Sequence, residues 1–311
     1  MTKILIHLGL PKTATTSLQH NVLQKLHEQG RINFLGKNLD YCDATGKVTV
    51  HNYTGKFIRD AAEKKISLGF AREKLIQYID KDKLNVFSDE GLMVAYPGLH
   101  NLPLKQKIEN LAELLEGYEV EIALTLRNPV DYFYSLYVQL YPDFYSQIKE
   151  LNTIEKYTEK LVIENDNVLF ESFFYDSYLP FLKENFKVEL SYFEDLIEDK
   201  NTFYQVWADL LNLTFEEFKE LFEQVHVNKK QKTGAGSKKS FSLKFIETYI
   251  RNKLKNSKFL YDSAKMFYVF FKLEAVFNKR RILNSVHAIP TGHSLNSLHR
   301  IFNVNKYERN L

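Results

Sequence analysis

The chain has 311 residues, of which 44% are hydrophobic and 26% are charged, with a formal net charge of +3. This composition is typical of a globular protein with a sizeable core and excludes a mainly disordered or fibrous chain. The only cysteine, Cys42, excludes an internal disulfide framework and a cysteine-based zinc site. The first apolar run is too short for a secretory signal, and none reaches the roughly 18–20 apolar residues of a membrane span. We therefore expect a cytoplasmic protein.

Short apolar runs alternate with segments of helical spacing along most of the chain. The expected strands are residues 3–8, 31–35, 84–88, 119–126 and 188–193. The expected helices are residues 18–26, 57–79 (with Gly69 as a weak point), 104–115, a segment opened by Asp131, 153–162, 175–186, 203–211 and 215–225. Residues 38–54 are polar, and we interpret them as a loop or an irregular hairpin. This alternation predicts an α/β domain with a mainly parallel central sheet.

The C-terminal part of the chain has a different composition. Between residues 226 and 258 there are ten Lys or Arg and one acid. Residues 228–240 are basic and contain glycine, as in a flexible boundary, whereas residues 242–281 have a helical, aromatic pattern. We predict an α/β domain over residues 1–236 and a helical C-terminal extension over residues 237–311.

The excess of positive charge in this segment predicts a local anionic partner and argues against nucleic-acid binding by the whole chain. The aromatic segment at residues 266–281 has a basic end. We interpret it as core packing, with a peripheral membrane contact or an oligomer contact as the alternatives. The sequence does not define the oligomeric state.

The most informative stretch, HLGLPKTATTSLQ (residues 7–19), lies between the first strand and the first helix. At a helix start the backbone N–H groups lack intrahelical partners, and together with the helix dipole they form an anion site. Lys12 adds a positive charge. The sequence neighbours of Ala14 add hydroxyl donors: Thr13, Thr15, Thr16 and Ser17. We interpret His7, which precedes this loop, as a hydrogen-bonded packing residue.

This stretch departs from the nucleotide-triphosphate loop G-x-x-x-x-G-K-S/T. Counted from Gly9, Ala14 and Thr15 take the places of the second glycine and the lysine, and only Thr16 agrees. The lysine stands at the fourth position, where it cannot meet a γ-phosphate in the usual way. A nucleotide-dependent kinase is therefore disfavoured and is kept as the competing enzyme class.

A second motif, RNPVDYFYS (residues 127–135), follows the expected strand at residues 119–126. Pro129 and Asp131 suit the first turn of a helix. Arg127 stands at the carboxyl end of the strand, where ligands bind in open α/β sheets, and its guanidinium matches phosphate oxygens. Ser135 follows eight residues later and can share a face with the helix entrance.

Together the two motifs resemble those of sulfotransferases that use 3′-phosphoadenosine 5′-phosphosulfate (PAPS). The P-K-T-x-T-S/T-S pattern resembles the 5′-phosphosulfate loop, and R-N-P-x-D-x-x-x-S resembles the 3′-phosphate motif. The resemblance covers about residues 3–236. It implies a P-loop-like, three-layer α/β/α fold, transfer of a sulfuryl group from PAPS to a hydroxyl, 3′,5′-diphosphoadenosine as the product, and no metal.

The resemblance also assigns roles to residues. Lys12 would contact the oxygen that bridges phosphate and sulfate, and Arg127 and Ser135 would hold the 3′-phosphate. The YFEDL segment (residues 192–196) resembles the family's Y-E-D-L segment. Lys232 lies where cytosolic members carry a nucleotide-covering loop, although the R-K-G triplet of that loop is missing. The implied nucleotide-binding residues are Lys12, Thr13, Ala14, Thr15, Thr16, Ser17, Arg127, Ser135 and Lys232.

The candidate catalytic base is Glu90, which follows the expected strand at residues 84–88. The S-D-E-G-L segment resembles the carbohydrate-type branch of the family, in which a strand-end Glu removes the acceptor's proton. The implied acceptor is a hydroxyl on a carbohydrate, glycolipid or polysaccharide. Asp89, which can instead cap the next turn, and His100 remain alternatives for the base. A non-enzymatic module that binds an acidic polymer or a membrane surface through the basic segment is the third interpretation.

Overall fold

The computed structural model describes residues 2–42, 47–141, 143–224 and 292–302. These residues form two compact units. The first holds residues 2–132, 164–224 and 302, and the second holds residues 133–163 and 292–301. The predicted boundary after residue 236, Lys232, the basic segment and the aromatic segment at residues 266–281 lie outside the described residues and stay predictions.

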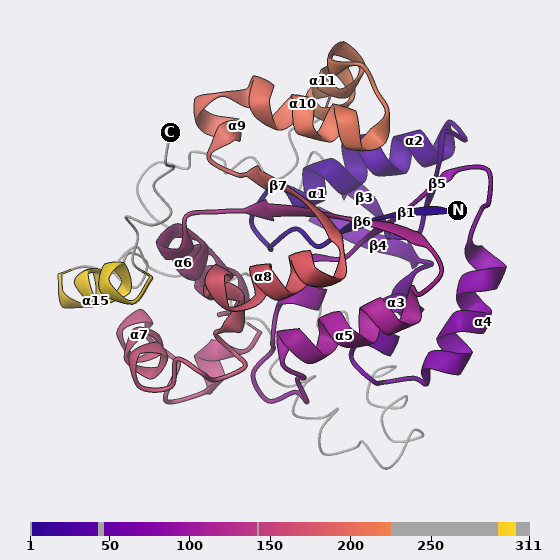
Figure 1. Cartoon of the computed structure of the whole chain (residues 1–311). Helices are drawn as coiled ribbons and strands as arrows, with labels where there is room; N and C mark the ends of the chain where they lie inside the picture. The colour runs from indigo at the N-terminus through magenta and orange to yellow at the C-terminus, as the bar shows by residue number, and fades with distance from the viewer. Residues whose placement is uncertain (1, 43–46, 142, 225–291, 303–311) are drawn as a thin grey trace, which may run out of the picture. The chain divides into compact units, whose positions relative to one another are not determined.

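A five-stranded, wholly parallel sheet forms the centre of the first unit (Figure 1). Its strands are β1 (Lys3–His7), β2 (Ile32–Phe34), β5 (Leu84–Ser88), β6 (Glu119–Leu126) and β7 (Lys187–Tyr192). They lie in the order β2-β5-β1-β6-β7. The chain therefore builds one half of the sheet on one side of β1 and the other half on the opposite side. Such a reversal of strand order opens a crevice at the carboxyl ends of the strands, next to β1.

Helices cover both faces of the sheet, which gives the predicted three-layer α/β/α architecture (Figure 1). On one face, Leu5, Val86 and Ala123 pack in one apolar cluster with side chains such as Val22 and Trp207. The helical elements of this side are η1 (Leu18–Leu23), α2 (Gln24–Glu28), α10 (Lys200–Leu211) and α11 (Phe215–Glu223). The alternate strand residues point to the other face. That face is covered by α3 (Lys56–Ala62), α5 (Leu104–Leu114) and α8 (Tyr175–Asn185).

Several shorter helical elements accompany the longer ones. The N-terminal helical run begins with α1 (Thr15–Ser17), and α9 (Asp195–Glu198) precedes α10. Single 3₁₀ turns form η2 (Glu90–Met93), η3 (Tyr145–Gln147) and η4 (Glu171–Phe173). The helix α6 (Pro129–Leu140) begins at a proline, as the sequence predicts, and runs from the first unit into the second.

The second unit contains the rest of α6, α7 (Ile154–Ile163) and most of α15 (His293–Phe302). Its core is aromatic. The ring of Phe133 stacks on that of Tyr157 at 4.6 Å between centroids, and the hydroxyls of Tyr145 and Tyr157 lie 3.1 Å apart. The first of these contacts makes Phe133 of α6 a packing residue of this core.

Two segments differ from or extend the predictions. In the segment predicted as a loop or an irregular hairpin, the described residues form two antiparallel strands, β3 (Lys37–Cys42) and β4 (Lys47–Tyr53), whose register shifts at Asn38/Leu39. The single helix predicted over residues 57–79 is wrong. It is two helices, α3 and α4 (Leu68–Tyr78), because Lys64 adopts a left-handed conformation (φ 53°) and Ser67 caps a new helix start. Gly69 lies inside α4 and not at the break.

None of the described helices, from α1 to α11 and α15, has both the length and the apolar character that a bilayer span requires.

Candidate functional site

The two sequence motifs and the candidate base follow three neighbouring strands. The N-terminal loop (residues 9–14) follows β1, Asp89 and Glu90 follow β5, and Arg127 follows β6. In the sheet, His7 at the end of β1 lies beside Ser88 of β5 and Ala123 of β6. Parallel strands end at the same edge, so the fold brings these three segments to one edge of the first unit.

The backbone of the N-terminal loop alternates in handedness. Lys12 and Ala14 have positive φ angles of 70° and 64°, whereas Thr13 between them does not. Alternation of this kind turns successive N–H groups toward a common concave side, which is an anion-binding arrangement. Left-handed residues other than glycine cost about 1–3 kcal/mol each and concentrate at functional sites. Ala14 is also the N-cap of α1 and supplies no side-chain cap to the helix N–H groups.

The side chains of the loop divide into two groups. Thr13 and Thr15 are buried, and Thr13 Oγ1 donates a hydrogen bond of 2.6 Å to the carbonyl oxygen of Leu10. The Thr13 hydroxyl therefore stabilises the loop itself. The predicted nucleotide-binding residues of this segment that keep solvent access are Lys12, Ala14, Thr16 and Ser17.

Close packing under the loop requires a glycine. A Cβ atom on Gly9 would lie 2.2 Å from His7 Nε2 and 2.9 Å from Thr15 Cγ2. His7 is itself buried, with Nδ1 hydrogen-bonded to Ser88 Oγ at 2.8 Å and its ring 4.9 Å from that of Trp207. Burial lowers the pKa of His7 to about 3, so its imidazole is neutral at physiological pH.

Arg127 is in direct contact with the N-terminal loop. Its Nη1 donates a hydrogen bond of 2.9 Å to the carbonyl oxygen of Lys12, 115 residues earlier in the chain. The guanidinium of Arg127 lies over the ring of Phe193, 4.5 Å from the centroid. The backbone carbonyl oxygen of Arg127 accepts a hydrogen bond of 2.6 Å from Tyr175 Oη. The YFEDL segment therefore supplies an aromatic surface beneath Arg127.

The charge of Arg127 is incompletely compensated within the first unit. Burial lowers the pKa of Arg127, although Asp131 and Glu194 act in the opposite direction. Among the described residues no carboxylate forms an ion pair with it, and its buried Nε has no hydrogen-bond partner. A partly buried cation with an unused donor is a suitable contact for an anion.

Two predicted nucleotide contacts are not tested by this geometry. Ser135 is half-buried on the part of α6 that belongs to the second unit. Lys232 lies outside the described residues. Their roles at the 3′-phosphate stay predictions.

Asp89 and Glu90 have different environments. Asp89 is wholly buried, pairs with Lys37 Nζ at 2.8 Å and Arg59 Nη1 at 3.1 Å, and accepts from the Gly91 N–H at 2.9 Å. Burial acts to raise the pKa of Asp89, but the two cations outweigh it and hold the pKa below its usual value. Asp89 thus caps η2 and anchors a charge cluster.

Glu90 is the more accessible carboxylate, with 22% of its side chain exposed and Lys37 Nζ 3.6 Å from its Oε1. His100 is exposed in the connection between η2 and α5. Of the three candidate bases, Glu90 combines solvent access with a defined position at the carboxyl end of β5.

Four residues of this region were not singled out by the sequence. Lys37 and Tyr53 come from the β3–β4 hairpin and Arg59 from α3, and all three contact Asp89. Gln19 is 2% exposed and contacts Glu90. The sequence did contain one indication for Gln19. It is a polar residue next to Leu18, on the side of the first predicted helix that faces the core, where a buried amide needs a hydrogen-bond partner.

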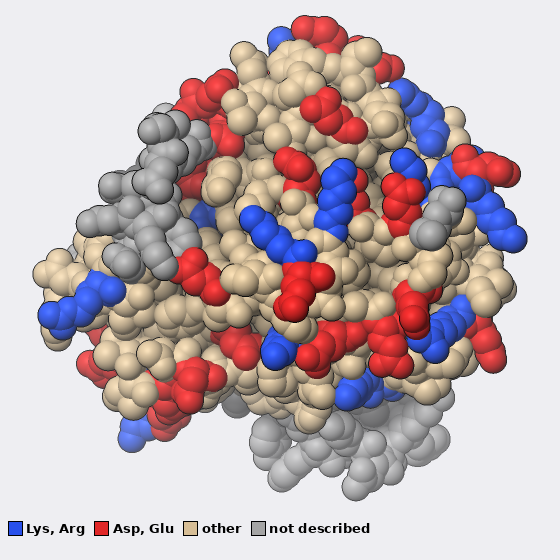
Figure 2. All heavy atoms as spheres, viewed as in Figure 1, with Lys and Arg blue, Asp and Glu red and all other residues tan. Residues whose placement is uncertain are grey.

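The described residues contain no group of three or more His, Cys, Asp or Glu side chains arranged to hold a metal ion. Figure 2 shows acidic and basic side chains interspersed on the face that it presents, with no broad area of a single sign.

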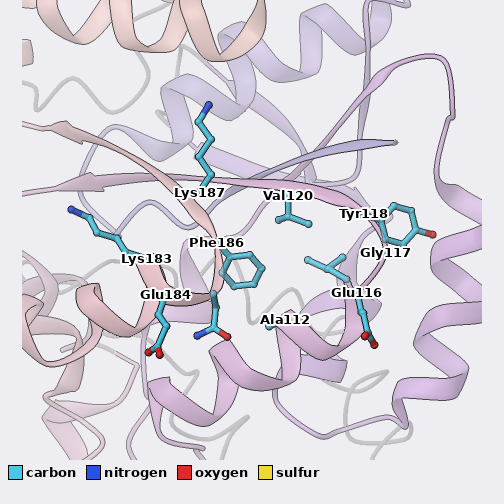
Figure 3. Close-up of a pocket in the computed structure, with 11 residues that line it drawn as sticks. Ala112, Glu116, Gly117, Tyr118, Val120, Lys183, Glu184, Phe186 and Lys187 are labelled. Atoms are coloured by element: carbon cyan, nitrogen blue, oxygen red, sulfur yellow. The ribbon is translucent and has the colours of Figure 1, made fainter.

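A hollow of about 480 Å³ lies at the opposite end of the sheet (Figure 3). Val120 near the start of β6 and Lys187 at the start of β7 line it, together with Lys183 and Glu184 of α8. None of the residues predicted for the site belongs to its lining.

No protein-family model matches the chain, and no curated protein matches it. Among solved structures, the chain is similar to a sulfotransferase from Alicyclobacillus acidocaldarius, with 13% identity, a TM-score of 0.43, and coverage of 84% of this chain and 96% of that one. It is also similar to a sulfotransferase domain from the curacin biosynthetic pathway, with 13% identity, a TM-score of 0.33, and coverage of 75% and 81%.

Proposed function

We propose that the protein is a sulfotransferase that moves a sulfuryl group from PAPS to an acceptor hydroxyl. The observation that carries the proposal is the hydrogen bond of 2.9 Å between Arg127 Nη1 and the Lys12 carbonyl oxygen. It joins two motifs that are far apart in the sequence and that resemble the two phosphate-binding motifs of one nucleotide. A donor with a phosphate at each end of its ribose requires such a pair of neighbouring anion sites.

The residues fit this donor in three respects. The alternating backbone at Lys12 and Ala14, with the uncapped start of α1, provides N–H groups for the 5′-phosphate. Lys12 lies exposed in the same loop, and we assign its ammonium to the bridging oxygen. Arg127 offers the 3′-phosphate its Nε, which has no hydrogen-bond partner among the described residues, and a charge that no carboxylate of those residues pairs with.

The chemistry assigns one role to each group. PAPS supplies the sulfuryl group: the acceptor oxygen bonds to sulfur while the bond from sulfur to the phosphate oxygen breaks. Lys12 stabilises the negative charge on the departing phosphate oxygen, and Glu90 takes the acceptor's proton. Positioning and electrostatics account for most of the acceleration in group transfers of this kind.

The acceptor class rests on the S-D-E-G-L resemblance. A carboxylate base at Glu90, and not a histidine, favours a hydroxyl on a carbohydrate, glycolipid or polysaccharide. Peripheral membrane contact through residues 266–281 remains a separate proposal. Vesicle flotation of a chain that ends at residue 240 tests it, because equal flotation of the shortened and full chains contradicts it.

The competing kinase interpretation requires an acidic group free to hold Mg²⁺ at a strand end. Asp89 occupies such a position at the end of β5, but it is paired with Lys37 and Arg59. Titration calorimetry separates the two classes. We expect 3′,5′-diphosphoadenosine to bind without Mg²⁺ and more tightly than ATP with Mg²⁺, and the reverse order contradicts the proposal.

We expect Arg127→Ala to weaken binding of 3′,5′-diphosphoadenosine by about 1.5–3 kcal/mol, the range for a lost charged hydrogen bond. Arg72→Ala is the matched control, because Arg72 Nη2 also donates to a backbone carbonyl, that of Glu113, at 2.8 Å, but on the surface of α4. Calorimetry on both variants provides the measurement. Equal affinities in the two would remove Arg127 from the nucleotide site.

A further inference from the structure

We infer that Gln19 is a positioning residue, which holds the carboxylate of Glu90 in a fixed orientation and ties it to the helical run that begins at the N-terminal loop. The inference rests on the proposed function, because it assigns to Gln19 an effect on the base of that reaction. Gln19 acts through Glu90 and need not touch the substrate.

Both amide protons of Gln19 have defined acceptors. Nε2 donates to Glu90 Oε2 at 3.0 Å and to Ser88 Oγ at 2.9 Å. Ser88 Oγ is in turn hydrogen-bonded to Nδ1 of the buried His7 at 2.8 Å. Two hydrogen bonds therefore hold the amide group of Gln19 in one orientation. The acceptors Ser88 and Glu90 are themselves held in place, because they lie at and just after the end of β5 and Ser88 is bonded to His7 at the end of β1.

Gln19 occupies a place where an apolar side chain would be expected. It is 2% exposed, and its neighbours Leu18 and Val22 belong to the apolar core. Burying an amide is unfavourable unless it is hydrogen-bonded, so its position calls for a specific role. Gln19 also lies in η1, a π-helical turn, and such turns occur frequently at functional sites.

This placement joins the donor loop to the base. Gln19 follows Ser17, the last residue of α1, by two positions, so the helical run that begins directly after the loop also carries the group that holds Glu90. A site built on a rigid element keeps its reacting groups in register better than one built on separate loops.

The two oxygens of Glu90 face different donors. Oε2 accepts from the neutral amide of Gln19, whereas Oε1 lies 3.6 Å from the ammonium of Lys37. The amide fixes the carboxylate without adding a charge, and a carboxylate has about four lone-pair sites. Glu90 is thus oriented by Gln19 and still able to accept a proton.

The test uses two substitutions in the full chain. Gln19→Leu removes both donors at similar volume, and we expect it to lower kcat roughly 10- to 100-fold while the KM for PAPS stays unchanged. Gln19→Glu places a second carboxylate against Glu90. Because like charges disfavour ionisation, we expect the acidic limb of its rate–pH profile to move to higher pH. A merely structural role of Gln19 would lower stability in both variants and leave the kcat of Gln19→Leu unchanged.

The matched control is Gln205→Leu. Gln205 is exposed on α10 and donates through Nε2 to Asp209 Oδ1 at 2.8 Å, so the substitution removes a similar amide–carboxylate bond away from Glu90. We expect wild-type kcat and an unshifted pH profile. If the profiles of Gln19→Glu and wild type coincide, the inference is overturned.

A nucleotide-free measurement separates this inference from the proposed function. Urea unfolding of Gln19→Leu, Glu90→Leu and the double variant forms a cycle that needs no nucleotide, because each single substitution removes one partner of the hydrogen bond between Gln19 and Glu90. If wild type neither binds 3′,5′-diphosphoadenosine nor transfers sulfate, the proposed function fails. In that case the cycle still tests the inference. The coupling of Gln19 to Glu90 is supported if the loss of unfolding free energy in the double variant differs from the sum of the two single losses, and it is overturned if the losses add.

Discussion

Glu90→Gln should slow sulfuryl transfer by roughly 10²–10⁴-fold, the contribution typical of a positioned general base. The affinity for 3′,5′-diphosphoadenosine should not change, because Glu90 lies after β5 and the proposed phosphate contacts follow β1 and β6. An amide at this position keeps the size of the side chain and its acceptor for Gln19, but it cannot take the acceptor's proton.

Rapid-quench measurement of transfer, with calorimetry of nucleotide binding on the same variant, provides the two readouts. His100→Ala serves as the second arm, since His100 is exposed on the connection to α5. We expect it to retain wild-type rates. Normal turnover of Glu90→Gln would show that Glu90 is not the base. Loss of turnover in His100→Ala would favour His100 in that role.

Asp89→Asn should act on stability, with a loss of about 3–5 kcal/mol in the free energy of unfolding, because it breaks a buried charge cluster. Lys37 and Arg59, whose side chains are each 19% exposed, would keep their charges without the carboxylate that compensates them. Substitutions of these two adjacent carboxylates therefore have different expected effects. Glu90→Gln lowers the rate of sulfuryl transfer, whereas Asp89→Asn lowers the free energy of unfolding.

Urea unfolding at neutral pH provides the measurement. Glu119→Gln is the control, since Glu119 pairs with Lys3 at 3.5 Å and both side chains are exposed (54% and 64%), and such surface pairs contribute about 0–1 kcal/mol. A loss for Asp89→Asn no larger than that of the control contradicts the structural role.

The pH dependence of stability provides a second readout for Asp89. The pKa of Asp89 is held below its usual value in the folded state, so its contribution is fully present above the unfolded value of 3.8. It is lost as the pH falls through the lower, folded value. Wild type should therefore lose part of its stability below about pH 4, and Asp89→Asn should lack that component.

The strands were predictable because buried parallel strands are continuous apolar runs bounded by polar residues. The ranges expected for β5 and β6 agree with the structure to the residue. The break between α3 and α4 was not predictable from periodicity. It depends on the left-handed backbone of Lys64, and lysine is otherwise a good helix former.

The placement of the site could also be anticipated in part. Arg127 and the N-terminal loop follow parallel strands, and parallel strands end at one edge of the sheet, so their proximity followed from the motifs. Their hydrogen bond could not be foreseen, because it depends on the course of the loop backbone. The Lys37 contact with Asp89 depends on the fold of a polar hairpin whose own sequence carries little apolar pattern.

The most direct measurement is a crystal structure of the protein with bound 3′,5′-diphosphoadenosine. The account predicts that one nucleotide bridges the carboxyl ends of β1 and β6, with its 5′-phosphate on the backbone after Pro11 and its 3′-phosphate on the guanidinium of Arg127. A nucleotide seated in the hollow beside Lys183 and Lys187, or one whose phosphates avoid Arg127, would contradict it.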